Sequence, residues 1–252
     1  MFYVAKIIAF VEIANIRKYF LRCLVGKVLF CFQKSVYLQS FRNEIAMDFL
    51  TFRKRMYHLG CFNVNQVEIW EHAFDRNSLT RWCDKGLLVK LKNEYYAFPE
   101  YRQMNDFARY VANKIYRPSY ISLHSALSFY GIIPEEVISI TSVTTLKTNK
   151  FVNDFGTFTY QKIKRGMFFG YEPKLLSDGR AMMFATPEKA ILDLLYLYPF
   201  YKTEQDMLEL RFDDYFMQED LNVGRLNDYL GRISCKALTQ RVNTMLKVYN
   251  IL

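Results

Sequence analysis

The sequence predicts an α+β protein, because segments with a helical spacing of apolar residues alternate with segments rich in β-branched and aromatic residues. The stretch "ATPEKAILDLLYL" shows the first pattern and "FGTFTYQKIK" the second. With 252 residues, 51% of them hydrophobic, the chain can bury a core in one large domain or two small ones. This composition excludes global disorder.

Residues 47–98 combine short helical segments with a terminal hairpin. The expected elements are a helix around 49–57, a helix within "NVNQVEIWEHAF", a helix over 76–85, and strands over 87–91 and 95–98 around the turn at 92–94. The order helix, helix, turn, helix, hairpin is that of a winged helix-turn-helix, whose third helix enters the major groove of DNA.

The third helix has one apolar and one polar face. A wheel at about 100° per residue gathers Leu79, Trp82 and Cys83 on one arc. The opposite arc carries the polar residues Asn77, Arg81 and Asp84, flanked by Ser78, Thr80 and Lys85. Asp75 is the expected N-cap and Gly86 the expected C′ residue.

The polar face carries side chains that can read bases. Arg can pair with guanine and Asn with adenine through two hydrogen bonds each. The expected base-reading residues are Asn77, Ser78, Thr80 and Arg81. The expected contacts to the DNA backbone are Arg53, Lys54, Arg55, Arg76, Lys85, Lys90 and Lys92.

The charge distribution limits this interpretation. The net charge is +9, but residues 57–98 carry five basic and five acidic side chains, so a winged helix that contacts only protein remains an alternative. A second basic surface is expected at Lys147, Lys150, Lys162, Lys164 and Arg165. Residues 201–228 hold three basic against eight acidic side chains and could face a partner or the domain's own basic strands. For both segments an ordinary solvated surface is the alternative.

Residues 1–46 differ from the rest of the chain. They are aromatic and basic, with seven Lys and Arg against two Asp and Glu. Charges such as Lys6, Glu12 and Arg17 interrupt the apolar run, which argues against a membrane span or a secretory signal. Two interpretations remain: a basic amphipathic arm that touches membrane or nucleic acid, or a chain that starts at Met47.

In the second half of the chain, the sequence pattern changes from helical to strand-like and back to helical. A connector helix is expected within 99–118, followed by an α+β domain over 119–252 with a central, mainly antiparallel sheet and a helical C-terminus. Its expected elements are helices at 122–130 and 186–198, strands at 137–145 and 155–164, and C-terminal helices at 204–212, 219–230 and 236–249. Thr186 is the expected N-cap of the second helix, with Pro187 at its first position.

Catalytic and metal-binding patterns are missing from the sequence. The five cysteines form no CxxC pair and the three histidines are dispersed, so no metal site is expected. The chain also lacks a Gly-rich phosphate loop, GxSxG and HExxH. We therefore expect a non-enzyme without cofactor or small-molecule substrate. Scattered, odd-numbered thiols indicate a reducing, cytoplasmic setting.

An ordered set of segments resembles a known family. "SLTRWCDKGLLVKLKNEYYAF", "YISLHSALSFYGIIPE", "ITSVTT", "FGTFTYQKIK", "FFGY" and "ATPEKAILDLLYL" follow one another as in the AbiEi antitoxins, the transcriptional regulators of bacterial type IV toxin–antitoxin (abortive infection) systems. The resemblance covers roughly residues 48–200.

This resemblance implies a function for each half. The winged helix would bind inverted repeats in its own promoter through a reading helix at Asn77 to Asp84 and a wing at Val89 to Tyr96. The second domain would counteract a nucleotidyltransferase-like toxin without a stable complex. Residues 1–46 have no counterpart in the family pattern, which favours the Met47 start. The alternative is a non-catalytic protein-interaction module in phage defence.

Overall fold

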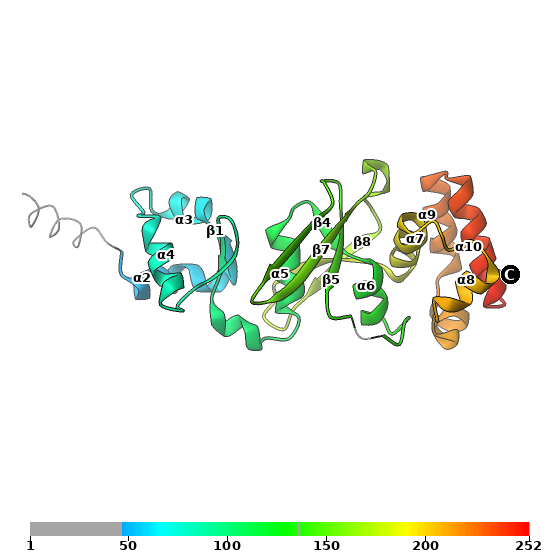
Figure 1. Cartoon of the computed structure of the whole chain (residues 1–252), viewed down its shortest axis with the longest axis horizontal. Helices are drawn as coiled ribbons and strands as arrows, with labels where there is room; N and C mark the ends of the chain where they lie inside the picture. Colours follow the sequence, from blue (N-terminus) through cyan, green and yellow to red (C-terminus); the bar gives the residue numbers. More distant parts are fainter. Residues whose placement is uncertain (1–46, 136, 252) are drawn as a thin grey trace, which may run out of the picture.

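The computed structural model describes residues 47–135 and 137–251. The two interpretations of residues 1–46 therefore lie outside the described residues. The described chain forms three successive blocks along the long axis of the molecule (Figure 1). They are a small helical block with its own sheet, a six-stranded sheet with two helices, and a C-terminal group of helices.

The first block contains three α-helices, a 3₁₀ helix at Tyr57–Leu59 and a three-stranded sheet. Its elements are α2 (Phe49–Met56), β1 (Cys61–Asn63), α3 (Val64–Trp70), α4 (Asn77–Asp84), β2 (Val89–Lys92) and β3 (Tyr95–Ala97). The strands are antiparallel in the order β1-β3-β2. The predicted helices and hairpin are confirmed as elements, whereas β1, which completes the sheet, was not predicted.

Aromatic side chains hold this block together. Phe52 lies at its centre, with ring centroids 4.6 Å from Trp82, 5.5 Å from Phe62 and 5.9 Å from Phe74. Trp82 and Leu79 are buried, which confirms the apolar arc predicted for the third helix. Each buried aromatic ring removes a large apolar area from water, so this cluster anchors α4 firmly to α2 and the sheet.

The ends of α4 differ partly from the prediction. Gly86 has φ +69°, the left-handed conformation that follows many helices and that glycine adopts without strain. The expected N-cap at Asp75 is wrong by one residue, because Arg76 occupies that position. Asp75 still serves the helix N-terminus, since its Oδ1 accepts the N–H of Asn77 at 3.0 Å.

The expected single connector helix is divided in two. A 3₁₀ helix spans Pro99–Gln103 and α5 spans Phe107–Ile115. Met104 is extended and Asp106 has φ +62°, so the chain turns between them. The two pieces stay in contact because Tyr101 stacks on Phe107 with centroids 4.5 Å apart.

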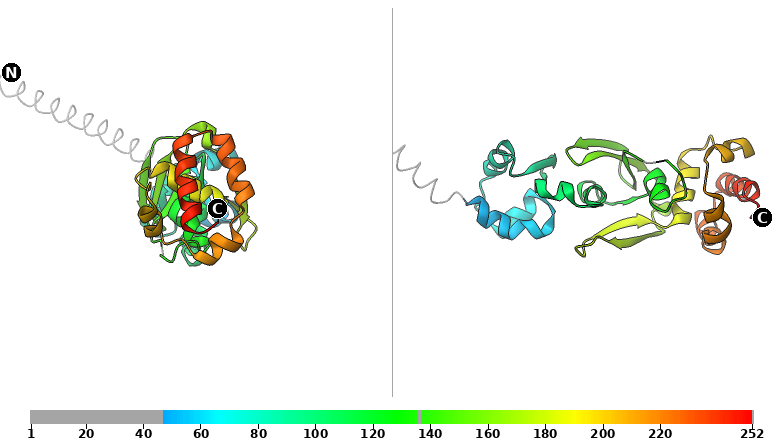
Figure 2. Two further views of the ribbon diagram at one scale, coloured as in Figure 1. Left: turned by 90° about the vertical axis from the view of Figure 1, so that its right-hand side faces the viewer. Right: turned by 90° about the horizontal axis from the view of Figure 1, so that it is seen from below.

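The second block is built on a six-stranded sheet. Its strands are β4 (Ser119–Ile121), β5 (Ile140–Thr144), β6 (Asn149–Asn153), β7 (Gly156–Lys162), β8 (Tyr171–Leu175) and β9 (Ala181–Ala185), in the order β6-β7-β5-β4-β9-β8. Figure 2 shows that the two ends of the sheet spread apart and that α5 and α6 (Leu123–Phe129) lie between them.

The sheet is mixed but mainly antiparallel, as predicted, since three of its five strand pairs are antiparallel. The β5–β7 and β4–β9 pairs are parallel, and the other three pairs are antiparallel. The β6–β7 hairpin inserts its second strand next to β5, and that strand then runs in the same direction as β5. Two strands joined by a hairpin can place either member against the sheet, and the sequence does not show which.

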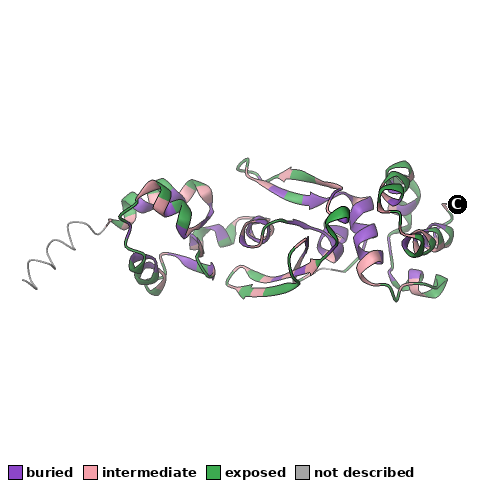
Figure 3. Ribbon diagram, turned by 90° about the horizontal axis from the view of Figure 1, so that it is seen from above, coloured by how far each residue is buried: buried purple, intermediate pink, exposed green. Residues whose placement is uncertain are grey.

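The C-terminal helices pack around α7 (Pro187–Leu197). They are α8 (Glu204–Glu209), a π-helical turn at Phe216–Asp220, α9 (Val223–Ile233) and α10 (Lys236–Val248). As predicted, Thr186 caps α7, accepting the N–H of Lys189 at 3.3 Å. The helix predicted over 219–230 begins later, because Asn222 caps it by accepting the N–H of Arg225 at 2.8 Å. Figure 3 shows α7 buried between the sheet and these helices.

A buried charged pair joins α7 to the sheet. Lys189 and Asp193 have no exposed side-chain surface and form an ion pair. Tyr120 and Ser122 donate hydrogen bonds to Asp193 Oδ2 at 2.9 and 2.8 Å, and Lys189 Nζ donates to the Tyr120 hydroxyl at 2.9 Å. Burial and the adjacent Asp193 carboxylate raise the pKa of Tyr120, so its hydroxyl stays protonated and can donate.

Loss of the Asp193 charge should destabilise the fold. Asp193→Asn keeps an acceptor for Tyr120 and Ser122 but leaves the Lys189 ammonium buried without a counter-charge, which costs about 3 kcal/mol. Urea unfolding followed by circular dichroism measures this. The exposed Asp214→Asn is the matched control, and the Lys189→Met, Asp193→Asn double variant should recover part of the loss. A single variant as stable as the wild type would contradict this account.

Candidate nucleic-acid interface

Helix α4 presents a polar face to solvent. Asn77, Thr80 and Arg81 are exposed on it, while Leu79 and Trp82 hold the other side in the aromatic core. Three of the four predicted base-reading residues therefore share an accessible face. Ser78 does not, because it is only 2% exposed. Its hydroxyl oxygen instead accepts a hydrogen bond from Arg81 Nη2 at 2.7 Å.

The arginines beside α4 are paired with carboxylates. Arg81 Nη2 lies 3.0 Å from Asp75 Oδ2. Arg76 pairs with Glu68, and its Nη1 lies 3.8 Å from Glu94 Oε1. These side chains are about half exposed, and surface ion pairs of this kind stabilise by no more than about 1 kcal/mol. Both arginines can exchange these partners for another anion at small cost.

Lys90 and Lys92 of strand β2 differ in exposure, and the pairing with β3 is irregular between them. Lys90 is exposed between the buried Val89 and Leu91. Lys92 lies over aromatic rings, with Nζ 4.5 Å from the centroid of Tyr95, 5.5 Å from Phe151 and 5.7 Å from Tyr116. Burial lowers the pKa of Lys92. The phosphate contact at Lys92 stays a prediction, and its partial burial against aromatic rings makes this lysine less accessible than Lys90.

The hairpin is attached to the six-stranded sheet. Strand β2 lies against β6, where Asn153 Nδ2 donates to the carbonyl of Leu91 at 3.0 Å. Arg102 forms an ion pair with Asp154 in the turn after β6. Together with Lys92, these contacts fix the hairpin to the second block.

The basic residues of α2 also differ in how accessible they are. Arg53 pairs with Glu100 and lies 4.6 Å from the ring centroid of Tyr57. The hydrogen bond to Glu100 raises the pKa of Arg53. Lys54 and Arg55 are exposed. Arg53 thus already pairs with a carboxylate of the same chain, which weakens its predicted role at the DNA backbone. Lys54 and Arg55 stay accessible.

The second basic set lies on and around β6 and β7, at one edge of the six-stranded sheet. All five of its members are exposed: Lys147, Lys150, Lys162, Lys164 and Arg165. Lys150 is on β6, which lies beside β2, whereas Lys162, Lys164 and Arg165 lie toward the far end of β7. Only part of the set therefore continues the surface of the hairpin.

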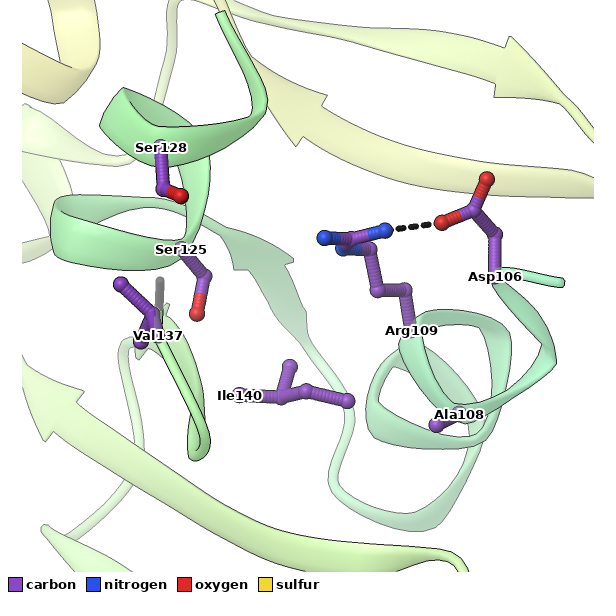
Figure 4. A pocket seen from close by; sticks show the side chains of 7 residues that line it. All are labelled: Asp106, Ala108, Arg109, Ser125, Ser128, Val137 and Ile140. Carbon is purple, nitrogen blue, oxygen red and sulfur yellow. Dashed lines mark hydrogen bonds and ion pairs between the residues drawn. The ribbon is translucent and has the colours of Figure 1, made fainter. Parts of the chain in front are cut away.

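A small pocket of about 240 Å³ lies between α5 and α6 (Figure 4). Its polar groups have partners within the chain. Arg109 pairs with Asp106, the Ser125 hydroxyl donates to the carbonyl of Ser139 at 3.1 Å, and the Ser128 hydroxyl donates to the carbonyl of Glu135 at 3.0 Å. The pocket therefore offers a ligand few unsatisfied polar groups.

Residues 47–135 and 137–251 contain no group of three metal-ligating side chains. Over the same ranges, no helix is long and apolar enough to cross a membrane.

No family model matches the chain, and no curated protein matches it. The family resemblance therefore stays a prediction.

The position of Lys92 leads to a stability prediction. Lys92→Ala should lower the free energy of unfolding by about 1 kcal/mol, because it removes the half-buried ammonium and its contacts with three aromatic rings. Lys90→Ala, two residues away on the exposed face, should change it by less than about 0.5 kcal/mol. Urea denaturation of both variants measures the difference, and equal effects would show that the aromatic contacts of Lys92 contribute nothing.

Proposed function

We propose that the protein is a DNA-binding transcriptional autoregulator, with residues 47–98 acting as a winged helix-turn-helix. The main observation that supports this proposal is that Asn77, Thr80 and Arg81 are exposed together on a helix whose opposite side is buried in an aromatic core. The order α2, β1, α3, α4, β2, β3 and the sheet order β1-β3-β2 support this, because winged helices pair a reading helix with such a hairpin.

The contacts proposed for DNA differ from those expected from sequence. Asn77, Thr80 and Arg81 read bases. Four exposed basic side chains hold the DNA backbone. They are Lys54 and Arg55 of α2, Lys85 at the end of α4 and Lys90 of β2. Arg76 joins them by exchanging Glu68 and Glu94 for a phosphate.

The second part of the proposal concerns the α+β domain. As the resemblance to AbiEi antitoxins implies, it counteracts a nucleotidyltransferase-like toxin in the cytoplasm without forming a stable complex, while the first block represses the shared promoter at inverted repeats. This part rests on the resemblance alone. If the adjacent gene encodes such a nucleotidyltransferase, the proposal gains direct support.

A second candidate function is a non-catalytic protein-interaction module in phage defence. The observation in its favour is the pairing of Arg76 and Arg81 with carboxylates, which leaves the face of α4 close to neutral. A partner protein with few charges would suit such a face better than a phosphate backbone does. A stable partner in pull-downs combined with no DNA binding would select this function.

The DNA proposal predicts two distinguishable variant effects. Arg81→Ala should weaken binding to the preferred site by about 1–3 kcal/mol and relax sequence preference, because a base contact is lost. Lys90→Ala should weaken binding to all sequences alike and reduce the salt slope by about 1, because one phosphate contact is lost. Mobility shifts against the DNA upstream of the gene, measured at several salt concentrations, separate the two.

Matched controls lie far from the proposed interface. Arg211→Ala removes an exposed arginine that is paired with Glu135, and Lys236→Ala removes an exposed lysine of α10. Neither should change binding. If the folded wild-type protein gives no sequence-specific shift at low salt, the regulator proposal is wrong.

A further inference from the structure

An apolar groove of about 560 Å³ lies at the opposite end of the sheet domain from the hairpin. Its buried lining includes Leu127 of α6, Leu194 of α7, and Leu210 and Phe212 just after α8. Open grooves lined mainly by apolar side chains are typical binding sites for apolar ligands or side chains.

Large apolar side chains are exposed around this groove. Ile138, which lines it, is 95% exposed. Phe200 is 62% exposed and packs on the lining residue Tyr201 with centroids 4.4 Å apart. An exposed apolar patch gathered at a concave site indicates that a binding partner covers it.

The charge around the groove restricts the chemistry of that partner. Glu135 and Glu209 line it, and Glu135 pairs with Arg211 at 3.1 Å. Glu209 forms no ion pair with any residue in the described ranges. The adjoining stretch 201–228 holds eight acidic against three basic side chains. The partner should therefore be rich in apolar side chains and positively charged.

One segment of this chain has that chemistry. Residues 1–46 carry seven basic and two acidic side chains among many aromatic and aliphatic ones. We propose that residues 1–46 dock in this groove of their own chain, with apolar side chains in the groove and basic side chains facing Glu209 and the acidic stretch 201–228.

The length of the segment permits this contact. The described chain begins at Met47 beside α2, at the far end of the molecule from α8 (Figure 1). Forty-six extended residues span up to about 150 Å, so the segment can return along the molecule. Because it is covalently linked, its effective concentration at the groove exceeds that of a free copy in dilute solution.

Photo-crosslinking in the full-length protein tests the docking. A benzophenone amino acid replaces Phe200 in one variant and Ile138 in another, and mass spectrometry maps the cross-linked peptides. Both positions are exposed, so the fold should tolerate them. We expect cross-links to peptides within 1–46 from both positions, and a several-fold lower yield when Glu209→Lys is added. The same group at Leu175, exposed at the end of β8, is the matched control and should give few such links.

An equal mixture of isotopically light and heavy protein identifies the chain that supplies the segment. Docking within one chain gives only light–light and heavy–heavy links. The proposal is overturned if neither Phe200 nor Ile138 links to residues 1–46, if Leu175 links equally well, or if the links are mostly mixed. A mixed pattern would assign the groove to the segment of a second copy. None of these results bears on DNA binding, which rests on α4 and the hairpin.

Discussion

The contact between the hairpin and the edge of the six-stranded sheet decides which residues of the first block can meet a partner. Lys92 is central to it, because its ammonium lies over Tyr95 of β3, Tyr116 just after α5, and Phe151 of β6. Residues two apart on a regular strand share a face, but the pairing of β2 with β3 is irregular between Lys90 and Lys92, and Lys90 stays exposed while Lys92 is partly buried. This one cation thus helps to join the two blocks.

The helices were largely predictable because their signals are local. Thr186 and Pro187 mark the start of α7 within two residues, and the apolar spacing of α4 identifies its buried side from the sequence alone. Several strands were not predictable for the opposite reason. Strands of three to five residues such as β4 and β6 carry too little pattern, and their pairing depends on partners far away in the chain.

The candidate interface was predictable to the same extent. The outward positions of Asn77, Thr80 and Arg81 follow from helical geometry. The contacts that Arg53 and Lys92 make within the chain do not, because their partners Glu100 and Phe151 lie 47 and 59 residues away in sequence. The burial of Lys189 and Asp193 was also hidden, since charged residues four apart on a helix usually form an exposed pair. Only the hydroxyls of Tyr120 and Ser122 explain why this pair is tolerated inside.

The ion pairs on α4 determine how such a surface could bind DNA. Arg81 and Arg76 are held by Asp75, Glu68 and Glu94, so the face has little net field to attract a phosphate backbone from a distance. Binding at this face must replace each carboxylate with a base or phosphate, and the exchange is favourable only where the geometry of the new contact is good. A wrong sequence offers no such contact, and the arginine then remains with its carboxylate. Paired arginines on an exposed helix therefore reduce non-specific affinity more than specific affinity, which suits a protein that must select one site among many.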